Sequence, residues 1–290
     1  MAHDGLRTGL MEVSQASYQI IADLLAARTG QQLTESRRWR IGTALAGLFR
    51  ERGISNVDQL VCMLASPGQA ALTDQVVEAL LNNETYFFRD RPTFDQLPEH
   101  IFPMLAERRA SKRRLQIWCA GCSTGQEVHS LAMQFAEERE RWEGWSIDIL
   151  GTDISRSAIS VARAGHYSQF EIQRGLSVAQ MLEHFEETAS GWQMHSSTRS
   201  IVRFQEHNVL DQPPAMSSFD LVLCRNVLLY FPIATRQRAF ARLHQAMTDD
   251  GILMLGAGET VIGQTCDFEP LPGYTSLYGA VRPTATALSA

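Results

Sequence analysis

Features that would point to a membrane protein or a nucleic-acid-binding protein are missing from this 290-residue sequence. No apolar run approaches the roughly 20 residues that a helix needs to cross a bilayer. The N-terminal stretch MAHDGLRTGLMEV also lacks the apolar core of a signal peptide. The formal net charge is −6, so there is no overall basic excess for nucleic acid, although a local basic patch remains compatible with that sum. We expect a soluble chain with neither membrane insertion nor a nucleic-acid partner.

Cysteine is scarce, and its pattern fits neither a disulfide framework nor a metal site. The five cysteines are Cys62, Cys119, Cys122, Cys224 and Cys266. An odd number without a leader sequence predicts reduced thiols in the cytoplasm. Cys119 and Cys122 form a C-x-x-C pair, but the second pair or the histidines that a zinc site needs are not evident. We expect no metal.

The first part of the chain, residues 1–81, predicts an all-helical N-terminal domain. Apolar residues recur at helical spacing from residue 15, and Gly30 and Gly53 are placed to end two helices. The second helix is expected to begin near Thr34 as its N-cap. Its apolar stripe is Trp39, Ile41, Leu45, Leu48 and Phe49. Further helices are predicted near 57–65, 73–82 and 93–109.

Residues 93–282 predict an α/β domain. The apolar segments LQIWCA, SIDILGTD, FDLVLCRN and GILMLGAG alternate with helical patterns, which is typical of a doubly wound parallel sheet. Residues 166–206 break this rhythm with a short helix and two alternating stretches, GWQMHS and SIVRFQEH. They predict a small inserted antiparallel β-subdomain. The tail 283–290 has little to bury and is expected to fray.

Polar residues follow the predicted strands, where a doubly wound sheet binds its ligands. Gly121 belongs to a turn, AGCSTG, whose glycines let the backbone approach a ligand closely. The turn lacks the Gly-Lys-Ser/Thr ending of a phosphate-binding loop. Glu127, just beyond it, could accept hydrogen bonds from an ammonium group. Asp153 could bind both hydroxyls of a ribose or could cap the next helix.

Two later strand ends leave similar alternatives open. Asn208 could bind the edge of an adenine ring or stabilise a turn. Arg225 and Asn226 follow an apolar strand directly and need polar partners; for Arg225 these could come from a ligand or from a structural salt bridge. The segment 82–92, which contains NNETYFFRD, is predicted to be a linker that docks over the sheet edge, because its three aromatic residues are costly to expose.

Several of these segments together resemble the CheR family of chemotaxis receptor protein-glutamate O-methyltransferases. They are NNETYFFRD, WCAGCSTGQEVHSLAM, GTDIS, FQEHNVLD, FDLVLCRNVLLYF and the GAGET turn, in that order. The resemblance runs from about residue 18 to residue 280, and the pairing of NETxFFRD with CRNVLxYF is highly specific. The chain departs from the usual family pattern at Gln126, Val128 and His129, and at Ala257.

The resemblance implies a class I (Rossmann-like) methyltransferase sheet with S-adenosylmethionine as methyl donor. It implies that the cofactor-binding residues are Asn83, Thr85, Arg89, Gly121, Glu127, Asp153, Asn208, Val209, Arg225 and Asn226. Arg89 and Tyr230 match residues thought to orient the substrate carboxylate. Arg37, Arg38 and Arg40 resemble the family's basic recognition helix, although such arginines more often form a solvated face.

The reaction that the resemblance implies is an SN2 transfer of the methyl group to glutamate carboxylates on the cytoplasmic helices of chemotaxis receptors. Two other functions stay open: a methyltransferase that acts on another protein or a small molecule, and a non-catalytic S-adenosylmethionine-binding adaptor. We expect a monomer.

Overall fold

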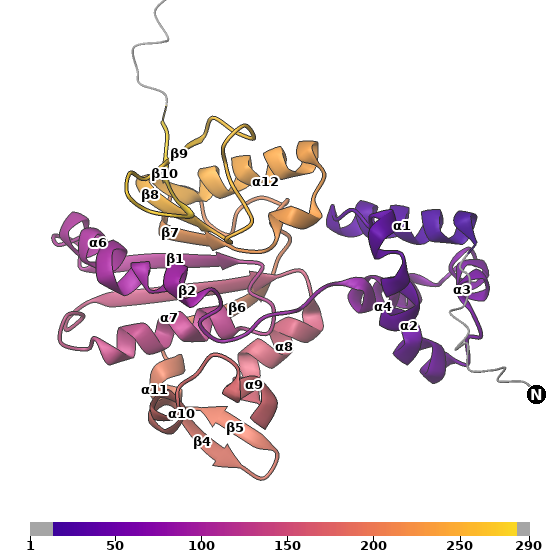
Figure 1. Cartoon of the computed structure of the whole chain (residues 1–290), viewed down its shortest axis with the longest axis horizontal. Helices are drawn as coiled ribbons and strands as arrows, with labels where there is room; N and C mark the ends of the chain where they lie inside the picture. Colours follow the sequence, from indigo (N-terminus) through magenta and orange to yellow (C-terminus); the bar gives the residue numbers. More distant parts are fainter. Residues whose placement is uncertain (1–13, 283–290) are drawn as a thin grey trace, which may run out of the picture. The chain divides into compact units, whose positions relative to one another are not determined.

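A computed structural model describes residues 14–282, so the expectations for the N-terminal stretch and for the tail 283–290 lie outside the described residues. The chain divides into two compact units, one up to Asn82 and one from Asn83 (Figure 1). None of the helices described within residues 14–282 is both long and apolar enough to cross a membrane.

The first unit is helical throughout. Its helices are α1 (Gln15–Thr29), α2 (Trp39–Arg52), α3 (Val57–Leu64) and α4 (Ala70–Leu80), with a 3-10 turn at Glu35–Arg37. Gly30 and Gly53 have φ angles of 78° and 64° and end α1 and α2, as the sequence predicts. Ile21, Ile41 and Leu45 are fully buried between the helices and hold the unit together.

The predicted start and apolar stripe of the second helix need correction. α2 begins at Trp39, because Thr34 opens the separate 3-10 turn. Trp39 is 65% exposed, whereas Ile41 and Leu45 are fully buried. Trp39 precedes Ile41 by two residues, or roughly 200° of helix rotation, so it lies on the opposite face from the core.

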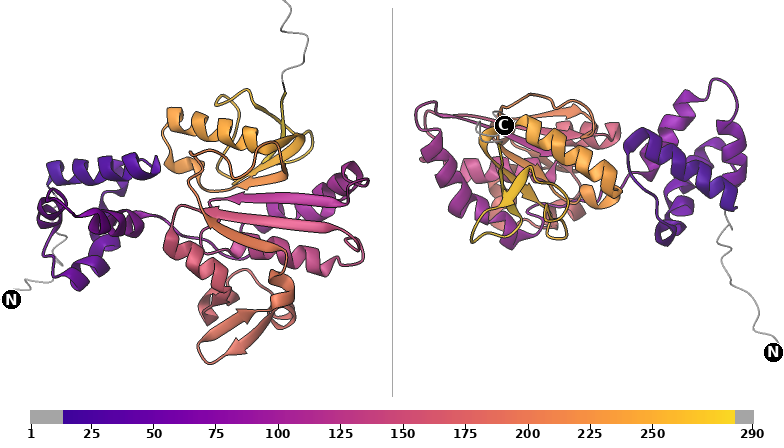
Figure 2. Two further views of the ribbon diagram at one scale, coloured as in Figure 1. Left: turned by 180° about the vertical axis from the view of Figure 1, so that it is seen from behind. Right: turned by 90° about the horizontal axis from the view of Figure 1, so that it is seen from above.

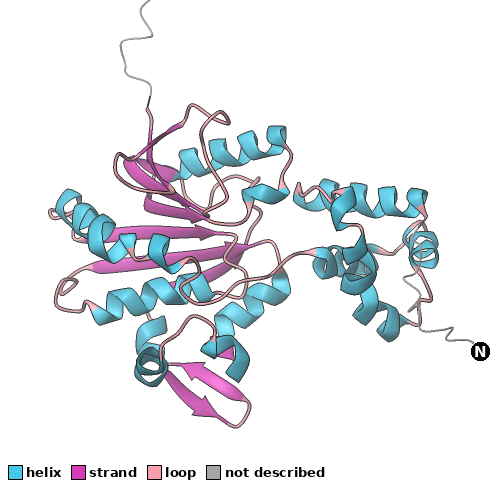
Figure 3. Ribbon diagram, viewed as in Figure 1, coloured by secondary structure: helices cyan, strands magenta, loops and turns pink. Residues whose placement is uncertain are grey.

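The second unit is a large sheet with helices and a small sheet (Figure 3). Its helices are α5 (Arg91–Phe94), α6 (Phe102–Arg108), α7 (Gln126–Glu137), α8 (Arg156–Ala164), α9 (Gln169–Gln173), α10 (Val178–His184), α11 (Ser196–Arg199) and α12 (Ile233–Ala246). Its strands are β1 (Arg114–Ala120), β2 (Ser146–Asp153), β3 (His166–Tyr167), β4 (Phe185–Thr188), β5 (Gly191–Met194), β6 (Val202–Glu206), β7 (Phe219–Cys224), β8 (Met247–Leu255), β9 (Phe268–Pro270) and β10 (Leu277–Ala280).

The large sheet has the order β6-β2-β1-β7-β8-β10-β9, in which the first five strands run parallel and β10 is antiparallel to both of its neighbours. Side chains alternate between its faces. Ile117 packs with α6 and α7 in one buried cluster, and Trp118 packs with α12 in another. This arrangement confirms the predicted doubly wound α/β fold and brings the carboxyl ends of β1, β2 and β7 to one edge.

Two predictions about elements in this unit are wrong. The stretch SIVRFQEH does not join the inserted subdomain: β6 pairs in parallel with β2, with Ile149 opposite Val202. The predicted helix 93–109 is broken into α5, a π-helical turn at Leu97–Ile101 and α6. Pro98 and Pro103 lack the N–H groups that a continuous helix would require at those positions.

The inserted subdomain is a three-stranded antiparallel sheet, β3-β5-β4. Its β4–β5 hairpin projects beyond the large sheet, with α9, α10 and α11 between them (Figures 1 and 2). Trp192 of β5 is largely buried and donates its indole N–H to the Gln169 side chain at 2.6 Å.

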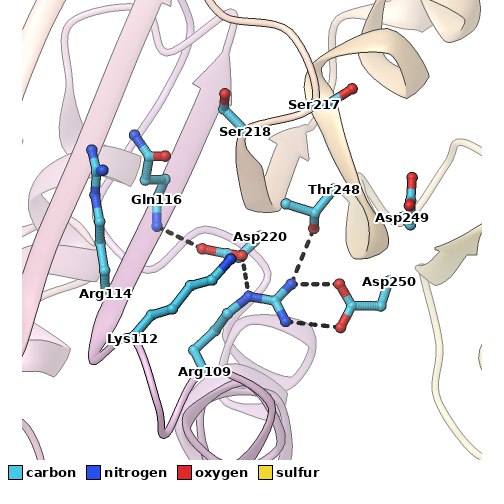
Figure 4. A pocket seen from close by; sticks show the side chains of 10 residues that line it. All are labelled: Arg109, Lys112, Arg114, Gln116, Ser217, Ser218, Asp220, Thr248, Asp249 and Asp250. Carbon is cyan, nitrogen blue, oxygen red and sulfur yellow. Dashed lines mark hydrogen bonds and ion pairs between the residues drawn. The ribbon is translucent and has the colours of Figure 1, made fainter.

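A charged cluster closes the amino ends of the central strands and lines a cavity of about 430 Å³ (Figure 4). The Arg109 guanidinium donates to Asp220 at 2.6 Å, to both carboxylate oxygens of Asp250 and to Thr248 Oγ1 at 3.2 Å. Asp220 also accepts the Gln116 N–H at 2.9 Å. Because the buried charges of Arg109 and Asp220 pair with each other and the exposed Asp250 completes the pairing of Arg109, we interpret the cluster as structural.

Replacing Arg109 by methionine should lower the free energy of unfolding by about 3 kcal/mol, because the carboxylate of Asp220 would stay buried without its partner. Arg109 and Asp220 have side chains that are only 12% and 6% exposed. Chemical denaturation at neutral pH measures the change. The matched control is Arg28→Met, which removes an exposed pair with Asp74 and should cost under about 1 kcal/mol. Equal losses in both variants would contradict the assignment.

Candidate functional site

The glycine turn after β1 brings three strand ends together. Gly121 and Gly125 have φ angles of 82° and 92°, which other residues rarely adopt. The Gly121 N–H donates to the carbonyl of Thr152, near the end of β2, at 2.8 Å. A Cβ atom on Gly121 would lie 2.3 Å from Val227, just after β7. The turn is therefore packed between its two neighbours, and only glycine fits at Gly121.

Asp153 is held rigidly at the end of β2. Its carboxylate accepts the Ser123 N–H at 2.7 Å and the Ser155 N–H at 2.9 Å. The N-cap of α8 is Ser155, whose hydroxyl accepts the Ala158 N–H. The helix-capping alternative for Asp153 is therefore wrong, while the ribose-binding role stays a prediction.

Arg225 connects three separate segments of the site. Its side chain is 1% exposed, and Nη1 donates to Glu127 at 3.0 Å. Nη2 donates to the carbonyl oxygen of Arg89 at 2.7 Å and to the carboxylate of Asp90 at 3.2 Å. The guanidinium carbon also lies 5.6 Å from the ring centroid of Phe94. Of the two roles left open for Arg225, these contacts match the structural salt bridge. A contact between Arg225 and a ligand stays a prediction.

Glu127 lies in the first turn of α7, and its side chain is 13% exposed. Burial raises the pKa of this carboxyl group, and the Arg225 guanidinium opposes that rise. The ion pair occupies Oε2. A carboxylate in this position can also bind an ammonium group of a ligand.

Asn226 is fixed by Glu259, a residue that sequence reasoning did not assign to the site. The Glu259 carboxylate accepts the N–H groups of Asn226 at 2.7 Å, Gly256 at 3.0 Å and Leu229 at 3.2 Å. Asn226 has a φ of 60°, and its side-chain oxygen is buried without a hydrogen-bond partner among residues 14–282. Its position in the sequence could have indicated this role, because Glu259 is an acidic residue in the turn that directly follows a buried strand.

The linker docks on the glycine turn as predicted. The Ser123 hydroxyl donates to the carbonyl of Asn83 at 2.7 Å, and the Asn83 side chain donates to the Ser155 hydroxyl at 3.2 Å. Further along, the Phe88 N–H donates to the Ser130 hydroxyl of α7 at 3.0 Å. Phe87 and Phe88 are both buried, whereas Thr85 between these contacts is only partly buried.

The inserted subdomain holds the other side of the linker, which sequence reasoning missed. The Phe87 ring lies 5.1 Å from Tyr167 and 5.7 Å from Phe185, edge to face. A Cβ atom on Gly175 would lie 1.8 Å from the Phe87 carbonyl oxygen. The linker is thus enclosed between the subdomain and the edge of the large sheet.

The two residues predicted to orient a substrate lie on different elements. The Arg89 side chain donates to the carbonyl of Glu84 at 2.9 Å and lies 5.7 Å from the centroid of the Tyr86 ring. Tyr230 ends a 3-10 turn that begins at Leu228, after β7. Their joint action on a carboxylate stays a prediction.

Of the two residues predicted to bind adenine, Asn208 stabilises a turn and Val209 belongs to the hydrophobic core. The Asn208 side-chain oxygen accepts the Leu210 N–H at 3.0 Å, which is the turn role that was left open. Val209 is buried in the cluster under α12. Their adenine-binding roles stay predictions.

Cys119, Cys122 and His129 are buried and do not form a reactive centre. Burial raises the pKa values of both thiols well above the ordinary value, so they stay protonated. Within residues 14–282 no group of three His, Cys, Asp or Glu side chains could hold a metal ion. His129 contacts the carbonyl oxygen of Ala162 at 3.2 Å, and burial lowers its pKa to about 4. It is a neutral packing residue.

The predicted docking arginines belong to the helical unit and are all partly buried. Arg38 donates to the Gln15 side chain at 2.6 Å and lies 5.0 Å from the centroid of the Tyr18 ring. Arg40 donates to Asn82 at 3.3 Å. Arg37 lies in the 3-10 turn before α2. Their docking role stays a prediction. Trp39, which lies between Arg38 and Arg40 in the sequence, is more exposed than any of the three arginines.

Comparisons with known proteins point to one family. The family described as "CheR methyltransferase, SAM binding domain" matches residues 83–276. "Chemotaxis protein methyltransferase 1" of Pseudomonas aeruginosa is 32% identical over 255 residues, covering 87% of this chain and 92% of that protein. "Chemotaxis protein methyltransferase Cher2" of Pseudomonas putida is 31% identical, covering 87% and 93%. A chemotaxis protein methyltransferase of Vibrio parahaemolyticus is also 31% identical, covering 89% and 94%.

The buried His129 predicts a loss of stability in mild acid. In the unfolded chain this imidazole takes up a proton as the pH falls through 6.5, whereas the folded chain resists protonation down to about 4. Stability should therefore fall between these values, by about 2 kcal/mol at pH 5. His129→Gln removes this component, so urea denaturation at pH 7 and pH 5 should give a smaller difference than in the unchanged chain. The exposed His100→Gln variant is the control, and an identical pH dependence in all three proteins would contradict the prediction.

Proposed function

The chain belongs to the CheR family of S-adenosylmethionine-dependent methyltransferases, and we propose that it esterifies glutamate side chains on the cytoplasmic helices of chemotaxis receptors. The observation that carries this proposal is the NNETYFFRD linker, held over the glycine turn by Ser123 and Arg225. The relatives' names support chemotaxis as the setting. We infer from the same family relation that the chain acts as a monomer in the cytoplasm.

The residues at the strand ends fit S-adenosylmethionine. The buried side-chain oxygen of Asn226 lacks a partner in the part of the chain that the structure describes, and a buried acceptor of this kind is costly unless a ligand supplies the donor. The fixed carboxylate of Asp153 suits a ribose. Glu127 and the backbone around Gly121 suit an amino acid moiety.

We assign the cofactor-binding role to the residues that the sequence predicts there. They are Asn83, Thr85, Arg89, Gly121, Glu127, Asp153, Asn208, Val209, Arg225 and Asn226. For Arg225 this role includes dividing its guanidinium between Glu127 and Asp90, so that it holds the Glu127 carboxylate in place for an ammonium group.

Positioning is the main task that remains for the protein. When bound, the cofactor supplies a methyl group on a positively charged sulfur, which a carboxylate oxygen can accept in one displacement. A glutamate is already ionised near neutral pH, so the site needs no general base. What it needs is alignment of the reacting atoms at roughly 3–3.5 Å. We assign that alignment to the guanidinium of Arg89 and the hydroxyl of Tyr230.

We propose that the helical unit recognises the acidic receptor helix through Arg37, Arg38 and Arg40. The 65% exposure of Trp39 adds an apolar anchor between these cations. Tryptophan and arginine are the residues that most often dominate the free energy of binding at protein interfaces.

Methyl transfer to a receptor cytoplasmic fragment tests the proposal directly. Labelled S-adenosylmethionine should yield fragment-bound label that alkali releases as methanol, because glutamyl esters hydrolyse in base. Arg89→Ala should lower kcat about 100-fold while it raises the dissociation constant of the cofactor, measured by calorimetry, by a smaller factor of less than about tenfold. The variant keeps the backbone carbonyl that Arg225 binds, so the linker should stay in place.

Three outcomes would contradict this reading. Binding of S-adenosylmethionine without methyl transfer would favour the alternative function, a non-catalytic adaptor. Alkali-stable label would favour another acceptor group. An unchanged kcat in Arg89→Ala, with Arg89→Lys as the conservative comparison, would remove Arg89 from the positioning role.

Recognition by the helical unit gives a separate prediction. Arg40→Glu should raise the KM for the receptor fragment about fivefold at low salt, and less in 0.5 M salt because exposed charges are screened. Trp39→Ala should raise it about tenfold at either salt concentration. Arg50→Glu, near the other end of α2, is the charge-matched control. Docking through this face is wrong if all three variants have the same KM.

A further inference from the structure

Three exposed apolar side chains lie close in the chain to the candidate site. Leu229 precedes Tyr230 in the turn after β7, Ile233 begins α12, and Ile262 lies in the segment after β8. Their exposed fractions are 38%, 68% and 69%. A single exposed apolar residue is common on protein surfaces, but three on two neighbouring segments call for an explanation.

The two loops that carry these residues are bonded to each other. The Leu229 N–H donates to Glu259 at 3.2 Å, and Arg236 of α12 donates to the side chain of Gln264 at 2.8 Å. The same guanidinium donates to the carbonyls of Leu228 and Phe231 at 3.2 and 3.1 Å. Figures 1 and 2 show α12 and the segment after β8 along the same margin of the large sheet. The loops therefore form one rigid surface.

The two stretches that carry these apolar residues contain no charged side chain. Neither 227–235 nor 260–264 contains an acidic or basic residue. Glu259 and Arg236, which border these stretches, are occupied by the loop contacts. A charged side chain brought against such a surface would lose hydration without gaining a partner, whereas an apolar one would gain from burial.

We propose that Leu229, Ile233 and Ile262 form an apolar rim that binds the apolar side chains flanking the acceptor glutamate on a helical substrate. This inference rests on the proposed function. A glutamate presented to Tyr230 from a helix has neighbours three and four positions away at roughly 5–6 Å, so these must meet the surface around the turn. The rim would then select glutamates by their flanking residues, while Arg89 and Tyr230 act on the carboxylate itself.

A double variant, Ile233→Ser with Ile262→Ser, tests the rim on the full chain. Its KM for a receptor cytoplasmic fragment should rise about tenfold, with kcat and the calorimetric affinity for S-adenosylmethionine unchanged. Met216→Ser is the control, since Met216 is 55% exposed but lies before β7 begins. A second fragment, in which serine replaces the apolar residues flanking the acceptor glutamate, should show the same rise with the unchanged chain and no further rise with the double variant.

Binding measured by fluorescence anisotropy separates this inference from the proposed function. If the unchanged chain binds the fragment through the rim but transfers no methyl group, the proposed reaction fails and the rim stands. The rim is overturned if the double variant and Met216→Ser have the same KM for the receptor fragment. It is equally overturned if the fragment with serine beside the acceptor glutamate has the same KM as the original fragment. It is also overturned if ultracentrifugation reveals a dimer that only the double variant loses, because a second copy would then cover this surface.

Discussion

The buried guanidinium of Arg225 is the constraint on which the site depends. An arginine with 1% side-chain exposure is tolerable only if its charge is matched, and the matching groups come from α7 and the linker. The fold must therefore bring Glu127, Asp90 and the end of β7 to one point. Once it does, the linker has only one place to lie, across the carboxyl ends of the parallel strands.

The aromatic pair in the linker fixes the same arrangement from the other side. Phe87 enters the space between Tyr167 and Phe185 of the inserted subdomain, while Phe88 packs near Phe94. The subdomain is consequently part of the enclosure of the site. The backbone that leads to Arg89 is therefore packed against the base of the hairpin.

Local sequence patterns predicted most of the helices and strands, whereas they could not predict contacts between segments that are distant in the sequence. Alternating apolar faces and the glycine stops depend on neighbours in the sequence, so β1, β2, β7 and the end of α1 could be placed. An alternating stretch such as β6 reads the same in a hairpin and at a sheet edge, and only pairing with Ile149 decides. The candidate site followed from the resemblance to the CheR family, but the partners of Arg225 and the role of Glu259 required three-dimensional proximity.

The contacts of Asp90 also bear on where the chain can be divided. A cut just before Asn83 would leave every partner of Arg225 within the second unit. A cut a few residues later, beyond Asp90, would strip the guanidinium of one carboxylate and one carbonyl while leaving the whole sheet intact. Whether the second unit can be expressed without the helical unit therefore depends on keeping the eight residues 83–90, which belong to no strand but contact the ends of the sheet.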